Sequence, residues 1–197
     1  MTNPSSDVAF SPAVKRVQTE RGSRAAYQRL EARGGFRTSI DEDLRAFLGD
    51  IDTAFLATAS ADGQPYVQHR GGDKGFIKVA SDTTLAIADL AGNRQYITTG
   101  NLLENDRFCL FLIDYEQRGR IKIWGHARTV PMTPELSKLL GSQKAERVLL
   151  LTITAWDGNC QQHIPRKFNA TDVAKALEER DARIAQLEAE LKKLKAS

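Results

Sequence analysis

The chain has 197 residues and a formal net charge of +3, with acidic and basic residues mixed along its length. That length favours one domain with appendages, whose core can form without disulfides. The mild charge gives no reason to expect a nucleic-acid partner, and no apolar run is long enough to cross a membrane. Two cysteines form no disulfide framework, and residues 1–12 lack the apolar stretch of a secretory leader. We therefore expect a cytoplasmic protein.

The first third of the chain predicts helices. Residues 1–38 are polar and predict a loose start followed by a helix over 23–32. Residues 39–50 predict a short helix, with Ser39 as N-cap and Glu42 completing a capping box. We interpret residues 1–38 as an N-terminal arm and residues 39–168 as the main domain.

The main domain predicts short strands separated by turns. Its apolar or alternating segments are residues 54–59, 65–70, 76–80, 85–88, 108–114, 120–129 and 148–155. Asp62-Gly63 predicts a hairpin turn, because this pair readily supplies positive φ. Helices are predicted after Gly92, with Gly92 or Asn93 near the start, and over 133–140, with Thr133 as cap. The fold class is therefore mainly β with flanking helices (α+β), and the strands predict a closed or nearly closed antiparallel barrel.

Residues 169–197 differ from the rest because they predict one long charged helix, with Thr171 as N-cap. Apolar residues recur at the a and d positions of about three heptads, with Arg180 as the polar exception. The seam consists of Val173, Leu177, Arg180, Ile184, Leu187, Leu191 and Leu194. Two interpretations stay open: a helix packed on its own domain, and a coiled coil of two chains.

A cluster of hydrogen-bond donors follows the fourth strand, at Asn93, Arg94 and Gln95. A helix that starts here would present backbone N–H groups and its positive dipole end to an anion. Arg94 would add a guanidinium suited to a phosphate. The alternative is an ordinary helix cap beside a surface arginine.

Two further clusters lie on strands. Gln68, His69 and Arg70 end one strand just before Gly71, where a glycine allows close approach to the backbone, and Lys78 follows on the next strand. This chemistry suits an anionic or heteroaromatic ligand. Alternation places the side chains of Arg120, Lys122 and Trp124 on one face of a later strand. That face suits an anionic aromatic ligand at a subunit boundary, or else belongs to a solvated edge strand.

Cys160 and His163 have a spacing that could begin a metal site. The remaining histidines, His69 and His126, show no matching ligand spacing, so we expect no metal. A nucleophilic Cys–His pair lacks a local third group to orient it.

The series of these motifs resembles the pyridoxamine 5′-phosphate oxidase-related family of flavin-binding split barrels. The order is a strand pair ending in QHRGG, then ADLAGNRQYITTGNLLENDR, FCLFLIDY and RIKIWGHARTV. The flanks RGSRAAYQRLEARGGF and WDGNCQQHIPRKF resemble a flavin-nucleotide-binding subgroup. The resemblance implies a six-stranded antiparallel split β-barrel and a homodimer with FMN at its interface.

The resemblance also assigns residues to the cofactor site. It implies phosphate contacts at Asn93, Arg94 and Gln95, in a segment opened by Asp89, with Gln95 standing where the family has lysine. Arg70 or Lys78 would compensate for that lysine. The strand facing the flavin ring matches residues 67–71, and partner-subunit contacts match Arg120, Lys122 and Trp124. His69, Arg70 and Lys122 are candidates for a donor near the N1–O2 edge of the ring.

Three functions remain open from the sequence. The first is an FMN-dependent oxidoreductase with a small-molecule substrate and an electron donor such as NAD(P)H. The second is a flavin carrier or redox sensor without turnover, and the third is a split barrel that binds deazaflavin or haem. True pyridoxamine phosphate oxidases end in a segment with tryptophan and Arg-Leu-x-Pro, whereas this sequence has the heptad helix there. We therefore expect no useful oxidation of pyridoxamine phosphate.

Overall fold

The computed structural model describes residues 3–141, 145, 147–159 and 162–196. Two helices, α1 (Pro12–Glu20) and α2 (Arg24–Glu31), follow a single 3₁₀ turn at Ser5–Val8 and form the N-terminal arm. The remaining helices are α3 (Glu42–Asp50), α4 (Ile97–Glu104), α5 (Pro134–Leu140) and α6 (Ala170–Ala196). The strands are β1 (Thr53–Ala59), β2 (Pro65–Gly71), β3 (Lys78–Ser81), β4 (Thr84–Asp89), β5 (Arg107–Asp114), β6 (Gly119–Pro131) and β7 (Arg147–Asn159).

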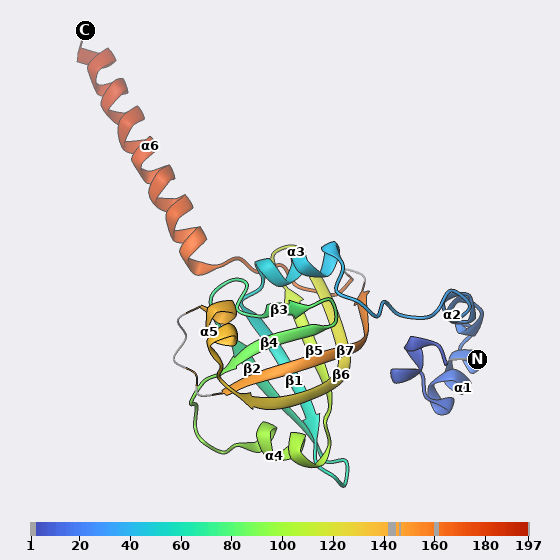
Figure 1. Cartoon of the computed structure of the whole chain (residues 1–197). Helices are drawn as coiled ribbons and strands as arrows, with labels where there is room; N and C mark the ends of the chain where they lie inside the picture. The colour runs from blue at the N-terminus through green and yellow to red at the C-terminus, as the bar shows by residue number, and fades with distance from the viewer. Residues whose placement is uncertain (1–2, 142–144, 146, 160–161, 197) are drawn as a thin grey trace.

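All seven strands belong to one antiparallel sheet with the order β2-β1-β5-β6-β7-β4-β3. The predicted α+β class with an antiparallel barrel is confirmed. The sheet contains one strand more than the six that the family resemblance implied, and its seven strands correspond to the seven segments predicted from the sequence. Figure 1 shows the sheet curling around its core, with α3 at one end and α4 at the other.

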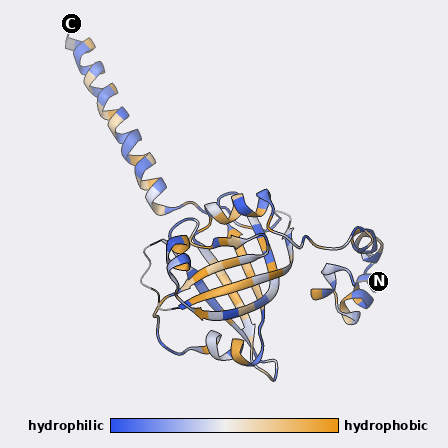
Figure 2. Ribbon diagram, in the orientation of Figure 1, coloured by the Kyte–Doolittle hydropathy of each residue, from blue (hydrophilic) through white to orange (hydrophobic). Residues whose placement is uncertain are grey.

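The core fills the barrel because inward and outward side chains alternate along its strands. On β1 the buried positions are Ala54, Leu56 and Thr58, and β5 contributes Phe108, Leu110 and Leu112 in the same way. Leu44 and Leu48 of α3 are buried in the same cluster, so this helix closes one end of the barrel. Figure 2 shows the resulting apolar bands on the strands.

Helix starts account for several differences from the sequence predictions. Asp41, not Ser39, caps α3, and its carboxylate accepts from the Leu44 N–H at 3.0 Å. The Ser39 carbonyl instead accepts from Trp156 Nε1 at 2.7 Å, which holds Ser39 outside the helix. The loose start predicted around Pro12 is wrong, since Ser11 caps α1 there. The Asn169 side chain, not Thr171, accepts from the backbone at the start of α6.

Other local predictions hold. Thr133 caps α5, and its hydroxyl accepts from the Leu136 N–H. Gly63 has a φ of 89° in the loop between β1 and β2, as the predicted hairpin turn requires. The division into an arm, a main domain and a terminal helix stays a prediction.

A membrane-spanning helix, which would have to be both long and apolar, does not occur in the described parts of the chain. The cytoplasmic location expected from the sequence stays a prediction.

Candidate functional site

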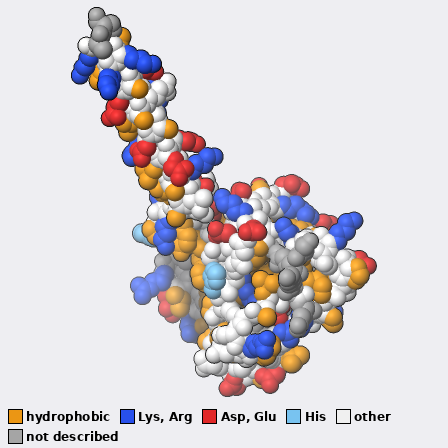
Figure 3. Space-filling view, turned by 90° about the vertical axis from the view of Figure 1, so that its left-hand side faces the viewer, with side chains coloured by type: hydrophobic (Ala, Val, Ile, Leu, Met, Phe, Trp, Pro, Cys, Tyr) orange, Lys and Arg blue, Asp and Glu red, His pale blue; other side chains and the backbone are white. Residues whose placement is uncertain are grey.

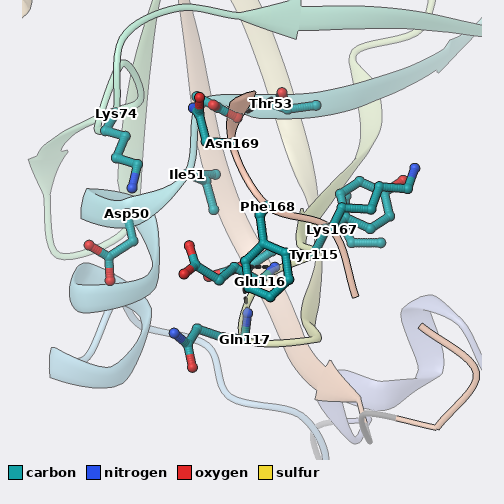
Figure 4. A pocket seen from close by; sticks show the side chains of 13 residues that line it. Asp50, Ile51, Thr53, Lys74, Tyr115, Glu116, Gln117, Lys167, Phe168 and Asn169 are labelled. Carbon is teal, nitrogen blue, oxygen red and sulfur yellow. Dashed lines mark hydrogen bonds between the residues drawn. The ribbon is translucent and has the colours of Figure 1, made fainter. Parts of the chain in front are cut away.

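A cavity of about 330 Å³ lies at the base of α6, beside α3 and the turn between β5 and β6. Figure 4 shows the side chains of Phe168, Glu116 and Gln117 among those that line this cavity. The charged residues that line it are Asp50, Asp52, Asp114, Glu116, Lys74 and Lys167. Four carboxylates against two ammonium groups make this cavity unfavourable for an anionic ligand.

A second cavity, of about 140 Å³, has the opposite charge balance. It lies between β2, the end of β4 and the loop that leads into α4, and the start of β7 completes it. Its lining contains six of the sequence-predicted residues: Gln68, Arg70, Asp89, Asn93, Arg94 and Gln95. The charged members of the whole lining are three arginines, Arg70, Arg94 and Arg147, and one carboxylate, Asp89. This cavity therefore favours an anion.

Two arginines converge on one buried carboxylate in the second cavity. Arg70 Nη1 lies 3.2 Å from Asp89 Oδ1, and Arg147 Nη2 lies 3.0 Å from Asp89 Oδ2. The arrangement follows from the sheet, since Asp89 and Arg147 are direct partners in the ladder between β4 and β7. Two guanidinium groups share a single carboxylate, so the group keeps a net positive charge.

Arg70 is also incompletely satisfied. Its side chain is only 12% exposed, and its Nε is buried without a hydrogen-bond acceptor among the described residues. A buried donor without an acceptor is costly and calls for an explanation such as a ligand that supplies the acceptor. A phosphate oxygen would meet this need, because guanidinium groups bind phosphate through several N–H donors.

Gln68 lines the same cavity, and its carbonyl oxygen is already used. Its Oε1 accepts from Thr98 Oγ1 at 3.0 Å and from Tyr66 Oη at 3.3 Å. Within the described residues, its Nε2 donates to no acceptor. The side chain can therefore offer a neutral donor to a ligand.

The loop before α4 differs from the prediction. The helix begins at Ile97, not at Gly92 or Asn93, because Arg94 (φ 59°) and Tyr96 (φ 54°) have left-handed backbones that an α-helix excludes. Asn93 instead closes a local turn by accepting from the Gln95 N–H at 3.2 Å. The argument that a helix N-terminus at Gly92 binds the anion is therefore wrong, and side chains supply the positive charge.

The predicted residues of β6 lie elsewhere, on the outer face of the sheet. Arg120, Lys122 and Trp124 alternate with buried Ile121 and Ile123, as predicted. The alternative of a solvated edge strand is wrong, because β6 lies between β5 and β7 in the middle of the sheet.

A continuous row of cross-strand partners links this face to β2. The ladder pairs His69 with Phe55, Phe55 with Phe111, Phe111 with Lys122, and Lys122 with Asp157. The rings of Phe55 and His69 meet edge to face with centroids 5.8 Å apart. Burial raises the pKa of Asp157, and the nearby charges of Lys122 and Arg37 oppose that rise. His69 therefore belongs to the outer face, although its neighbours Gln68 and Arg70 belong to the cavity.

Three predicted residues have local surroundings that the sequence did not indicate. Trp124 stacks on Phe36, which follows α2, with centroids 5.5 Å apart and an interplanar angle of 5°. A Cβ on Gly71 would lie 2.9 Å from the His69 ring. The space beside this glycine, which the sequence left for a ligand, is therefore occupied by the side chain of His69. Lys78 of β3 pairs with Ala86 of β4 and does not line the cavity.

Sequence reasoning missed Arg147 as a site residue. Its only local signal is a charged residue at the start of an apolar strand, and such residues are common. Its role depends on the pairing of β4 with β7, which lie nearly sixty residues apart along the chain. Tyr66, Tyr96 and Thr98 were also missed as lining residues, although each lies within three residues of a predicted one.

Cys160, considered above as part of a metal site with His163, lies outside the described residues. Across the parts of the chain that the structure describes, no three histidine, cysteine or carboxylate side chains are grouped to hold a metal ion.

The fold and the cavity define an antiparallel split-barrel protein with a cationic cavity of about 140 Å³. The sequence of residues 40–166, well over half of the chain, matches the family model described as pyridoxamine 5′-phosphate oxidase. The chain belongs to this family.

Solved structures of similar fold are known. HupZ from Group A Streptococcus aligns with a TM-score of 0.51 and 15% identity, over 66% of this chain and 99% of its own. A histidine-to-alanine variant of HupZ aligns with a TM-score of 0.50 and 15% identity, over 61% and 99%. An FMN-binding protein from Syntrophomonas wolfei aligns with a TM-score of 0.46 and 11% identity, over 75% and 95%. The HupZ likeness shows the fold alone. A search of curated protein sequences gives no significant match.

Proposed function

We propose that this chain binds FMN, with the phosphate in the cavity formed by Arg70 and Arg147, and that it acts as an oxidoreductase on a small-molecule substrate. The observation that carries the proposal is the group of Arg70, Asp89 and Arg147, in which the buried Arg70 Nε has no acceptor among the described residues. Membership of the family supports a flavin as the ligand.

The residues of the cavity fit a phosphate monoester. Arg70 lies on β2 and Arg147 at the start of β7, and Asp89 holds both side chains in place. Little side-chain entropy therefore remains to be lost on binding. Arg94 projects from the exposed loop before α4 and can approach the same group from outside. These cations would bind the phosphate in place of the lysine that the family has at the position of Gln95.

The size of the cavity supports a homodimer. About 140 Å³ lies below the roughly 300–1,000 Å³ typical of pockets that enclose a small-molecule ligand. One chain therefore offers room for the phosphate end, and a second chain would cover the rest of the ligand. Arg120 and Lys122 are half-buried on the outer face, where a partner can use them.

A bound flavin would supply the hydride or electron chemistry, and the protein would supply binding, orientation and electrostatics. Arg70, Arg147 and Gln68 would anchor one end of the ligand. His69 and Lys122 lie on the same outer row, and either can place a positive charge or a donor at a subunit boundary. The substrate stays unspecified.

The first test is the visible absorption spectrum of the purified protein, with mass analysis of what it releases on denaturation. We expect a flavin spectrum and the mass of FMN. Titration of flavin-free protein should then give much tighter binding of FMN than of riboflavin, which lacks the phosphate. Arg70→Ala should remove that preference, whereas Arg45→Ala should keep it. Arg45 is the matched control because it also pairs with an aspartate, Asp82, but lies on α3 outside the cavity.

A colourless protein that takes up no added FMN contradicts the proposal. Release of a deazaflavin or haem would support the third function left open by the sequence. Oxidation of NAD(P)H by the flavin-loaded protein would separate an oxidoreductase from a carrier or sensor, which binds flavin without turnover.

A further inference from the structure

No residue of α6 lines the cavity that contains Arg70 and Arg147. This helix of 27 residues is about 40 Å long and extends away from the barrel, as Figure 1 shows. Every residue from Ala170 to Lys195 is exposed. A helix gains most of its stability in proteins from a covered apolar face, so this length of exposed helix calls for a partner.

The apolar face of α6 is a heptad seam. Leu177, Ile184 and Leu191 occupy a positions, and Val173 and Leu187 occupy d positions. Their exposed fractions lie between 42% and 52%, large values for apolar side chains of this size. Figure 3 shows apolar side chains along the helix among side chains of both signs of charge. The spacing matches two-stranded packing, which buries a and d residues of one helix between those of another.

We propose that α6 pairs with α6 of a second copy of this chain as a parallel, in-register coiled coil. The choice of occupant rests on charges beside the seam. In a parallel pair, each g residue faces the e residue five positions further along the partner helix. Arg183 then faces Glu188, and Glu190 faces Lys195, so both charged pairs are attractive.

The antiparallel arrangement is less favourable. In the antiparallel register that packs Ile184 against Leu187 of the other helix, e residues face e residues and g residues face g residues. Asp181 would then face Glu188, and like charges at such positions are destabilising. Only the parallel arrangement makes every charged pair flanking the seam attractive.

Arg180 is the one polar residue in the seam. Its Nε and Nη2 donate to Asp181 Oδ1 at 3.3 and 3.1 Å, so its charge is partly neutralised within its own helix. A single polar residue in a seam lowers stability but specifies the register. In a parallel pair the two copies of Arg180 lie at the same level, where their like charges cost stability, and the Asp181 beside each one offsets part of that cost.

The parallel arrangement has a consequence for the barrels. The two helices start at the same end, so both barrels lie side by side at that end.

Cysteine cross-linking of the full chain tests the proposal. In a Cys109→Ser, Cys160→Ser background, Leu191→Cys places one thiol in the seam, and Ala189→Cys places it at the f position on the opposite face. Under mild oxidation we expect most of the Leu191→Cys protein, and little of the Ala189→Cys protein, to become a disulfide-linked dimer. Equal or absent cross-linking in the two variants would overturn the proposal.

Two further variants test orientation. Antiparallel helices would bring residue 191 beside residue 180, so preferential linkage between Leu191→Cys and Arg180→Cys chains in a mixture would overturn the parallel arrangement. Glu190→Lys should reduce the Leu191→Cys cross-link, because it would face Lys195 of the partner helix. Adding Lys195→Glu should restore the cross-link, and a further loss instead would count against the pairing. None of these readouts depends on bound flavin, so they stand apart from the test of the proposed function.

Discussion

The guanidinium of Arg70 and the carboxylate of Asp89 lie 3.2 Å apart with side chains 12% and 10% exposed. Arg147 occupies the second oxygen of the same carboxylate. Asp89 thus acts as an internal anion that keeps two cations together in the protein without ligand. A phosphate would compete with this carboxylate for the same donors. Asp89 is therefore expected to stabilise the flavin-free protein and to lower its affinity for an anion.

Asp89→Asn should separate these two effects. Loss of the carboxylate leaves Arg70 and Arg147 without their internal counter-ion, so we expect the flavin-free protein to lose roughly 1.5–3 kcal/mol of unfolding free energy. The same change should strengthen FMN binding, because the cavity becomes more positive. Urea unfolding and FMN titration measure the two quantities. Weaker FMN binding together with unchanged stability would show that Asp89 contacts the ligand directly.

Arg94 and Arg147 should contribute differently to FMN binding. We expect Arg94→Ala and Arg147→Ala each to lose a charge-assisted contact worth about 1.5–3 kcal/mol, with the larger loss at Arg147. Arg147 is half-buried and held by Asp89, whereas Arg94 is exposed on a loop and loses more freedom on binding. FMN titration of both variants, with Arg45→Ala as control, checks the order. Unchanged FMN affinity in Arg94→Ala would remove that residue from the site.

Local rules explain how much of the fold could be predicted from the sequence. Alternation predicted the inward and outward faces of β6, and Asp62-Gly63 predicted the first hairpin. These signals depend on side chains a few residues apart, which a single sequence contains. The start of α4 was mispredicted because positive φ at Arg94 and Tyr96 carries no dependable sequence signal in non-glycine residues.

The candidate site depended on long-range pairing. Arg70 and Asp89 were among the predicted residues, but their contact with Arg147 follows from the register between β4 and β7. No local pattern specifies which strand pairs with β4. The family resemblance grouped cavity residues with Arg120, Lys122 and Trp124, and in one chain these lie on separate faces of the sheet.

Substitution of Gly125 tests the packing of β6 against β7 in the barrel. A Cβ at this position would lie 1.9 Å from the Thr152 carbonyl oxygen, at the irregularity between β6 and β7. The clash is with backbone, so it is relieved only by moving a strand. We expect Gly125→Ala to lower the unfolding free energy by about 2–3 kcal/mol or more. Gly158→Ala is the control, because its Cβ would meet nothing within 4 Å. Equal unfolding midpoints in denaturant would contradict this packing.

Acid should loosen the N-terminal arm through Glu31. A hydrogen bond from Arg24 lowers the pKa of Glu31 below its ordinary value of 4.5; burial opposes this shift, and the ammonium of Lys15, 3.3 Å from Glu31 Oε1, adds to it. A carboxyl whose pKa is lowered by folding adds stability above its unfolded pKa and loses it as the pH falls through the folded pKa. We therefore expect the arm to be protected at neutral pH and to open as the pH falls below about 4.5.

Hydrogen exchange of residues 12–31, followed from pH 7 to pH 3 and corrected for the intrinsic rate, measures this opening. Glu31→Gln should expose the arm already at neutral pH and flatten the acid dependence. Glu20→Gln is the control, because Glu20 forms only an exposed pair with Arg16, and such pairs contribute little. If the arm of the Glu31→Gln variant still opens in acid, another carboxylate causes the opening. Asp7, which pairs with Lys15, would be the next residue to substitute.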